Sequence, residues 1–184
     1  MLLFAALIWV VLNFSYFKKN LQYQFGRHPV VAPDKVAEEK MDPDQVSIPA
    51  LGIVAPVVYV DEQSENTFQE ALKSGVVHFP DTASPGQSGN VYLFGHSSDN
   101  PWAQGEYKTV FALLPQIEIG TEILISDSEG NTYVYKAIET KVIDSDDLSV
   151  LDQGARDRKL LTLQTSYPVG TALRRFVVVA ELKD

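Results

Sequence analysis

Residues 160–182, LLTLQTSYPVGTALRRFVVVAEL, contain two β-like runs separated by a short turn. The first run mixes apolar and polar side chains and ends at Ser166, and the second is the apolar run FVVVA that follows Arg174 and Arg175. Alternating and β-branched runs of this length are typical of strands. The segment therefore predicts two strands, with a hydroxyl where one ends and two arginines where the next begins.

Similar short runs fill the chain from Gln45 onward, and turn residues separate them. The other β-like runs are residues 45–60, 89–96, 121–127 and 131–143. The sequence SEGN at residues 128–131 has the composition of a hairpin turn. Two segments have a helical pattern instead: residues 64–75, with Ser64 or Asn66 as the N-cap, and residues 107–116, ended by Pro115. Seven or eight strands with a few short helices predict a mainly β protein built as a barrel.

Composition limits the classes of function. The chain has 184 residues, a net charge of -9, a pI near 4.8 and no cysteine. This size suits one domain with an appendage. The negative charge argues against nucleic acid as a partner, and the missing cysteines exclude disulfides, thiolate metal sites and a thiol nucleophile. The sequence lacks the motifs of nucleotide-binding proteins, NAD-binding proteins, zinc proteases and serine hydrolases. The acidic run at residues 144–147 lacks the spacing of a calcium-binding loop. We therefore expect no cofactor and no metal.

The N-terminus predicts a membrane anchor. Residues 1–17 carry no charge, and Lys18 and Lys19 follow them. A length of 17 uncharged residues is the lower limit for a helix that crosses a bilayer. A cleaved signal peptide would need a basic start and a small-residue cleavage site, which are missing, and a buried core helix is the other alternative. We expect an anchor at 1–17, a proline-containing stalk at 18–43 and the globular domain at 44–184.

Three side chains could together perform acyl transfer, which needs a nucleophile, a proton-transfer group and a donor for the developing oxyanion. Ser166 could supply the nucleophile and an arginine the donor. His96, at the end of the run NVYLFGH, could transfer the proton. Taken singly, each residue has a simpler interpretation. Ser166 could be a turn hydroxyl, the arginine an exposed charge on an edge strand, and His96 a hydrogen-bonded structural histidine.

Taken together, the segments resemble the sortases, which are membrane-anchored cysteine transpeptidases of bacterial surfaces. The resemblance runs from about residue 45 to residue 182 through SIPALGI, SGVVHFPDTASPGQSGNVYLFGHSS, YVYKAIETKVI and TLQTSYPVGTALRRFVVVAEL. It implies an eight-stranded β-barrel with short helices. It also implies that His96 is the catalytic histidine and Arg175 the catalytic arginine, with Arg174 as the fallback.

The chain departs from the sortase pattern at the nucleophile. The family sequence TLxTC stands here as TLQTS, so Ser166 occupies the position of the reactive cysteine. A thiol ionises near neutral pH beside a cation, whereas a hydroxyl needs a base during the attack itself. Three explanations of Ser166 are open. The cysteine was replaced deliberately, the protein is a natural serine variant, or it is a degenerate sortase that only binds its peptide.

The resemblance also implies the partners and the location. Sortases cut an LPxTG-like sorting signal of surface proteins and join it to a cell-wall precursor or a pilin amine, outside the cytoplasmic membrane. The positive-inside rule opposes this topology, because Lys18 and Lys19 would place the domain in the cytoplasm. A membrane-anchored serine protease with a lysine base is a further alternative, for which Lys159 is the nearest lysine but is expected to face away from Ser166.

Overall fold

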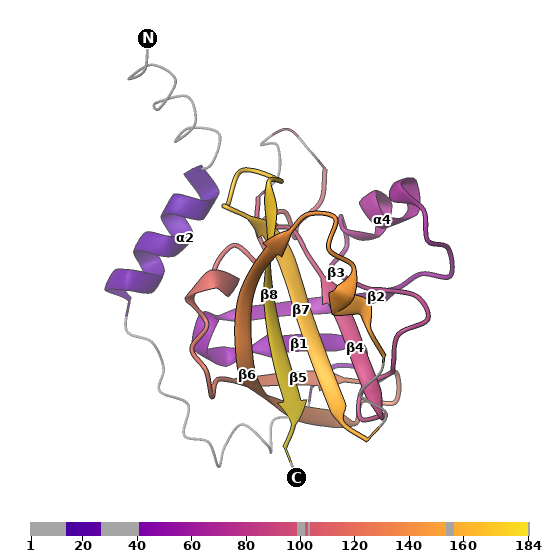
Figure 1. Cartoon of the computed structure of the whole chain (residues 1–184). Helices are drawn as coiled ribbons and strands as arrows, with labels where there is room; N and C mark the ends of the chain where they lie inside the picture. The colour runs from indigo at the N-terminus through magenta and orange to yellow at the C-terminus, as the bar shows by residue number, and fades with distance from the viewer. Residues whose placement is uncertain (1–13, 27–40, 99–101, 103, 154–156, 184) are drawn as a thin grey trace.

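A computed structural model describes residues 14–26, 41–98, 102, 104–153 and 157–183 (Figure 1). Within them, eight strands form one closed barrel, in the order β1-β2-β3-β4-β7-β8-β6-β5. The strands are β1 (Gln45–Ile48), β2 (Ile53–Tyr59), β3 (Val76–His78), β4 (Gly89–Phe94), β5 (Glu122–Ser126), β6 (Thr132–Asp144), β7 (Lys159–Tyr167) and β8 (Arg174–Leu182). The predicted eight-stranded barrel is therefore confirmed.

Most strand pairs are antiparallel, but two are parallel and set the geometry of the barrel. β2 pairs with β3, and β4 pairs with β7, in parallel. Parallel neighbours need a crossover connection, and the segment between β2 and β3 contains the helix α4 (Glu65–Ala71). Because β4 and β7 run in the same direction and β8 returns beside β7, the end of β4, the end of β7 and the start of β8 meet at one end of the barrel.

Alternating apolar residues fill the barrel. Leu161 and Leu163 of β7 are fully buried, as are Val178 and Ala180 of β8. Each buried leucine contributes roughly 1.5–3 kcal/mol relative to an exposed one. Tyr135 is also fully buried, and its hydroxyl accepts a hydrogen bond from the backbone N–H of Gly86 at 2.9 Å. The apolar periodicity of the sequence thus forms the interior of the barrel.

Local sequence signals explain several boundaries. Ser64 caps α4 by accepting a hydrogen bond from the N–H of Thr67, so of the two candidate caps the structure uses Ser64. The predicted hairpin at residues 128–131 joins β5 to β6; Gly130 there adopts a φ of 82°, and the Asp127 carboxylate accepts from the N–H of Asn131 at 2.9 Å. These short-range contacts lie within a few residues of one another, which is why the sequence reveals them.

Two local predictions need correction, and one short strand was not predicted. Residues 45–60 form two strands, because the 3-10 turn η1 (Pro49–Leu51) and Gly52, at a φ of 61°, separate β1 from β2. The short strand β3 was missed. Residues 107–116 form a series of turns ending in η2 (Leu114–Gln116) and not the predicted helix. The N–H of Phe111 donates to the His96 carbonyl and is therefore not available for a hydrogen bond within an α-helix.

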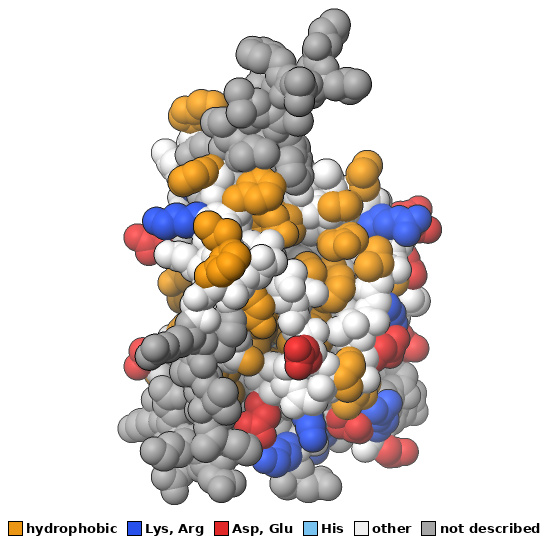
Figure 2. All heavy atoms as spheres, turned by 90° about the vertical axis from the view of Figure 1, so that its left-hand side faces the viewer, with side chains coloured by type: hydrophobic (Ala, Val, Ile, Leu, Met, Phe, Trp, Pro, Cys, Tyr) orange, Lys and Arg blue, Asp and Glu red, His pale blue; other side chains and the backbone are white. Residues whose placement is uncertain are grey.

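The N-terminal helix α2 (Phe14–Phe25) lies against the side of the barrel (Figure 1). It begins inside the predicted anchor and covers the first part of the predicted stalk, while residues 1–13 and 27–40 lie outside the described residues. No helix among the described residues is long and apolar enough to cross a membrane. Seen from the α2 side, hydrophobic side chains gather on the upper half of the molecule (Figure 2). The exposed hydrophobic residues of α2 are Phe14, Leu21 and Phe25.

Candidate active site

Strand register places the three candidate catalytic residues side by side. In the antiparallel pair β7 and β8, Ser166 lies directly opposite Arg175. In the parallel pair β4 and β7, Phe94 lies opposite Gln164, so the chain continuing two residues past Phe94 carries His96 to the level of Ser166. Neighbouring strands are about 4.8 Å apart. The serine is therefore flanked by the histidine on one side and the arginine on the other.

All three residues line one cleft of about 400 Å³ at this end of the barrel. α4 contributes one wall, and the loop between β6 and β7 contributes another. The remaining lining residues are Glu65, Phe68, Gln69, Leu72, Phe79, Tyr92, Phe94, Gly95, Ser145, Asp147, Leu148, Val150, Leu151, Gln164 and Thr165. The lining combines apolar and aromatic side chains with about as many polar and charged ones, so the cleft can contact both kinds of group on a ligand.

Buried backbone and hydroxyl contacts fix the positions of His96 and Ser166. The Thr165 hydroxyl, which is buried, donates to the Gly95 carbonyl at 2.8 Å, and the Gly95 N–H donates to the Gln164 carbonyl at 3.1 Å. A side chain at Gly95 would collide with Phe111 and Val110, so glycine is required there for close packing. The residues before the serine and before the histidine are thus bonded to each other.

A second link joins the two loops that follow His96 and Ser166. The N–H of Gly170, in the turn between β7 and β8, donates to the Ser98 hydroxyl at 3.0 Å. Ser98 follows His96 by two residues, and Gly170 follows Ser166 by four. The segments that carry His96 and Ser166 are therefore bonded to each other both before and after these two residues.

The two neighbouring arginines lie in different environments, as the alternation along β8 predicts. Arg174 is exposed, and its Nε lies 3.6 Å from the carboxylate of Asp144. Arg175 lines the cleft, and its Nη1 donates to the carbonyls of Ala172 and Arg174, each at 3.1 Å. A guanidinium has five N–H donors, so three remain beyond these two bonds. Arg175 is accordingly the arginine that can meet a ligand.

Aromatic rings form the floor and one wall of the cleft. Phe68 of α4 packs edge-on against Phe94 with ring centroids 5.2 Å apart, and Phe79 packs edge-on against Tyr92 at 5.9 Å. The Tyr92 hydroxyl donates to the side-chain oxygen of Gln164. Burial raises the pKa of Tyr92 well above its usual range, and the nearby charge of Arg175 opposes this rise only in part. Tyr92 therefore stays neutral and can hold Gln164 in place.

The chain also carries the histidines His28 and His78 and the acidic run at residues 144–147. His78 is buried, and its Nε2 lies 2.9 Å from the Ala83 carbonyl, so this histidine is a hydrogen-bonded core residue. In the acidic run, the Asp147 carboxylate accepts at 2.9 Å from the N–H of Ser149, the first residue of the 3-10 turn η3 (Ser149–Leu151). No cluster of potential metal ligands occurs among the described residues. His28 lies outside them.

Lys159 cannot serve Ser166 as a base. It starts β7, whereas Ser166 is the eighth residue of that strand, and seven residues at about 3.3 Å each separate them by roughly 23 Å. Lys159 is exposed and lines a different surface hollow, and the described lining of the cleft contains no lysine. The geometry therefore argues against the serine-lysine protease.

Several cleft residues were not identified from the sequence. Gln164 lies in the quoted TLQTS motif and faces the same side as Ser166, so strand alternation could have found it. Tyr92 and the α4 residues Glu65 and Phe68 carry no such signal, because only the barrel closure brings their elements to Ser166. The contribution of α4 to the cleft is a result of tertiary structure alone.

Known proteins share the sequence pattern and the β-barrel fold of this chain. The chain matches the family model for the sortase domain over residues 46–183. It is 29% identical to sortase D of Bacillus subtilis over 136 residues, which is 72% of this chain and 60% of that protein. It is 32% identical to sortase A of Listeria monocytogenes over 95 residues, or 52% and 39% of the two chains.

Solved structures show the same fold. A Clostridium perfringens sortase D5 transpeptidase superposes with a TM-score of 0.62 at 22% identity, covering 91% of this chain and 94% of the other. Sortase E of Streptomyces avermitilis gives 0.60 at 27% identity, covering 78% and 89%. The chain belongs to the sortase family, as the sequence resemblance predicted. It spans 60% and 39% of the length of the two curated relatives.

Proposed function

We propose that this protein is a sortase-type transpeptidase scaffold that binds an LPxTG-like sorting signal in the cleft and, as written, turns it over slowly. The observation that supports this most directly is the register of three strands, which sets Ser166 between His96 and Arg175. Membership of a family of transpeptidases gives the reaction class. The sorting motif and the acceptor follow from the family resemblance.

Each residue has one role in the proposed reaction. The Ser166 oxygen attacks the threonine carbonyl of the sorting signal while His96 takes the hydroxyl proton. Arg175 donates hydrogen bonds to the carbonyl oxygen as it becomes an oxyanion. The C–N bond then breaks, His96 returns the proton to the leaving amine, and an ester replaces the thioester of a cysteine enzyme. The acceptor amine then attacks this ester, its proton passes through His96 to the Ser166 oxygen, and the C–O bond breaks as the new amide forms.

The serine makes the first step difficult. A cysteine sortase uses a thiolate beside a cation, whereas serine needs a neutral imidazole aligned on its proton. General-base assistance is worth about 10²–10⁴-fold in rate, and each tenfold corresponds to about 1.4 kcal/mol of barrier. A site shaped for a thiolate would supply little of this assistance. Peptide binding should persist, because replacing sulfur by oxygen changes the cleft little.

The proposed setting is the outer face of the cytoplasmic membrane, with the N-terminal segment as a single-pass anchor. Sorting signals of surface proteins and the amines of cell-wall precursors or pilins are both available there. Protease added to intact protoplasts should remove the domain. Complete protection of the domain would instead favour the cytoplasmic orientation indicated by Lys18 and Lys19.

The decisive assay is cleavage of a quenched fluorescent LPxTG-like peptide, in the presence of an acceptor amine, by the chain as written and by Ser166→Cys. We expect the cysteine form to be faster by about 10²-fold or more, since it no longer needs base assistance in the attack. His96→Ala in the cysteine form is the control and should abolish the gain. Fast turnover by the serine form would identify a working serine enzyme.

A non-catalytic peptide-binding module is the second candidate, and Ser166 itself favours it. This candidate predicts that Ser166→Cys stays inactive across a panel of sorting motifs while both forms bind one of the peptides. Fluorescence anisotropy with the labelled peptide measures that binding independently of turnover. Loss of binding in Arg175→Ala would place the peptide in the cleft in either case.

A further inference from the structure

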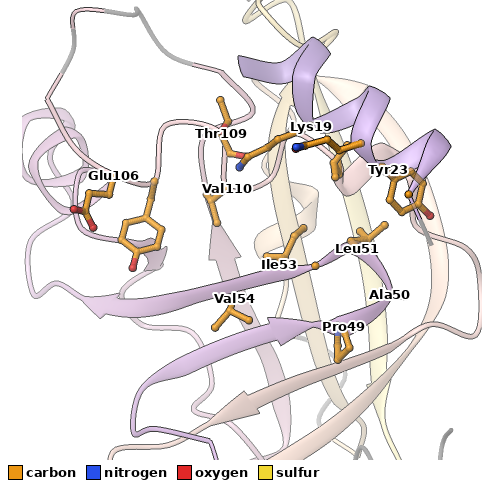
Figure 3. A pocket seen from close by; sticks show the side chains of 15 residues that line it. Lys19, Tyr23, Pro49, Ala50, Leu51, Ile53, Val54, Glu106, Thr109 and Val110 are labelled. Atoms are coloured by element: carbon orange, nitrogen blue, oxygen red, sulfur yellow. The ribbon is translucent and has the colours of Figure 1, made fainter. Parts of the chain in front are cut away.

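Helix α2 is attached to the barrel by a polar contact as well as by apolar packing (Figure 3). Lys19 extends from the helix toward the segment that carries Thr109 and Val110, and its Nζ donates to the Thr109 carbonyl at 3.0 Å. One helical turn later, Tyr23 packs against the barrel core. Burial lowers the pKa of Lys19, as expected for an ammonium that α2 holds against the barrel. Much of the Lys19 side chain is still exposed to solvent, as is that of Lys18, so the two lysines differ in the bond to Thr109 and not in exposure class.

The segment that Lys19 contacts is the one that holds the backbone of His96. Two residues after Thr109, the N–H of Phe111 donates to the His96 carbonyl at 2.9 Å. The side chains of Val110 and Phe111 also lie so close to Gly95 that a methyl group there would be 3.0 and 2.9 Å from them. One short series of contacts thus leads from Lys19 through residues 109–111 to the peptide unit of His96.

The same segment also touches the far wall of the cleft. The N–H of Glu106 donates to the Lys73 carbonyl, just after α4, at 3.3 Å. Leu72, the residue before it, lines the cleft together with Phe68 and His96. Residues 106–111 therefore bridge three parts of the molecule: the N-terminal helix, the end of α4 and the strand end that carries His96.

We propose that Lys19 is a positioning residue for His96 and that the docking of α2 sets the catalytic competence of the cleft. This proposal rests on the proposed function, because His96 must transfer protons for its position to matter. When α2 is docked, the Thr109 carbonyl is held by Lys19 and the turns of residues 107–113 stay closed. When α2 is displaced, the support of the His96 peptide loosens, although no residue that lines the cleft has changed.

The activity test uses the full chain carrying Ser166→Cys. Lys19→Met keeps most of the apolar stem and removes the donor to Thr109, and Lys18→Met removes the same charge one position away. One hydrogen bond is worth a factor of about two to ten. We expect Lys19→Met to lower kcat by about that factor with KM nearly unchanged, Lys19→Arg to restore it, and Lys18→Met to have no effect. Equal effects of the two methionine variants, or a change in KM alone, would overturn the proposal.

A second measurement does not depend on turnover. Amide hydrogen exchange of the chain as written, with Ser166 in place, reports the opening of the bond from the Phe111 N–H to the His96 carbonyl. Lys19→Met should speed exchange at Phe111 severalfold while Lys18→Met leaves it unchanged. Unchanged exchange in Lys19→Met would refute the coupling itself. Faster exchange beside an inactive Ser166→Cys form would refute the proposed function and leave the coupling standing.

Discussion

An arginine lies at each end of the β7–β8 pair, and the partners of the two arginines differ. The upper end carries the cleft and the lower end is the start of β7. At the lower end, Arg158 donates to both carboxylate oxygens of Glu181, at 2.7 and 2.9 Å. At the upper end, Arg175 lies opposite Ser166 and bonds only to backbone carbonyls through Nη1. A bidentate carboxylate satisfies the fork of a guanidinium and neutralises its charge, whereas backbone carbonyls do neither completely. The comparison separates an arginine used for structure from one available to a ligand.

The largest expected effect tests this difference directly. In the Ser166→Cys form, Arg175→Ala should lower kcat by about 10²–10³-fold, because it removes a donor to the developing oxyanion. Arg158→Ala and Arg174→Ala should leave kcat within about twofold, since both side chains are exposed and form ion pairs with carboxylates. Steady-state cleavage of the quenched peptide measures all three. A strong loss with Arg174→Ala and none with Arg175→Ala would reverse the assignment.

A smaller effect concerns the support beneath the cleft. Thr165→Val removes the buried hydroxyl that donates to the Gly95 carbonyl and should lower the free energy of unfolding by about 1–3 kcal/mol. Thr162→Val is the matched control, because its buried hydroxyl donates to Asn90 at 2.8 Å farther from the site. Urea unfolding should show similar losses for both. Only Thr165→Val should also slow the Ser166→Cys form, because only Thr165 holds the residue next to His96.

The smallest effect tests the structural role of His78. Burial lowers the pKa of His78 in the folded protein, so the unfolded chain binds a proton more readily, with an ordinary pKa of about 6.5. The free energy of unfolding should therefore fall as the pH drops below about 6.5, and this part of the fall should vanish in His78→Gln. Urea unfolding at pH 8, 6 and 5 measures it. An unchanged pH dependence in His78→Gln would show that other groups cause the fall.

Short-range chemistry made much of the fold predictable. The Ser64 cap, the turn at residues 128–131 and the alternation along 159–165 and 175–182 each depend on neighbours within a few residues. The prediction of a helix at residues 107–116 was wrong because a residue distant in the sequence intervenes. Its pattern is helical, but the Phe111 N–H is taken by the carbonyl of His96, fifteen residues earlier, and the segment becomes a series of turns. No local rule contains that competition.

The sequence by itself determined the β-rich class, the motif that identifies the sortase family, and the placement of Arg174 and Arg175 on opposite faces of one strand. All three follow from a period of two along a strand and from residue types that are close together in the chain. Tertiary structure alone decided that His96 meets Ser166, because the parallel pairing of β4 with β7 joins residues about seventy positions apart. It also decided the contact between Lys19 and Thr109, ninety positions apart. Such contacts form only when the closed barrel brings distant backbone together, and the amino-acid pattern around either partner carries no trace of the other.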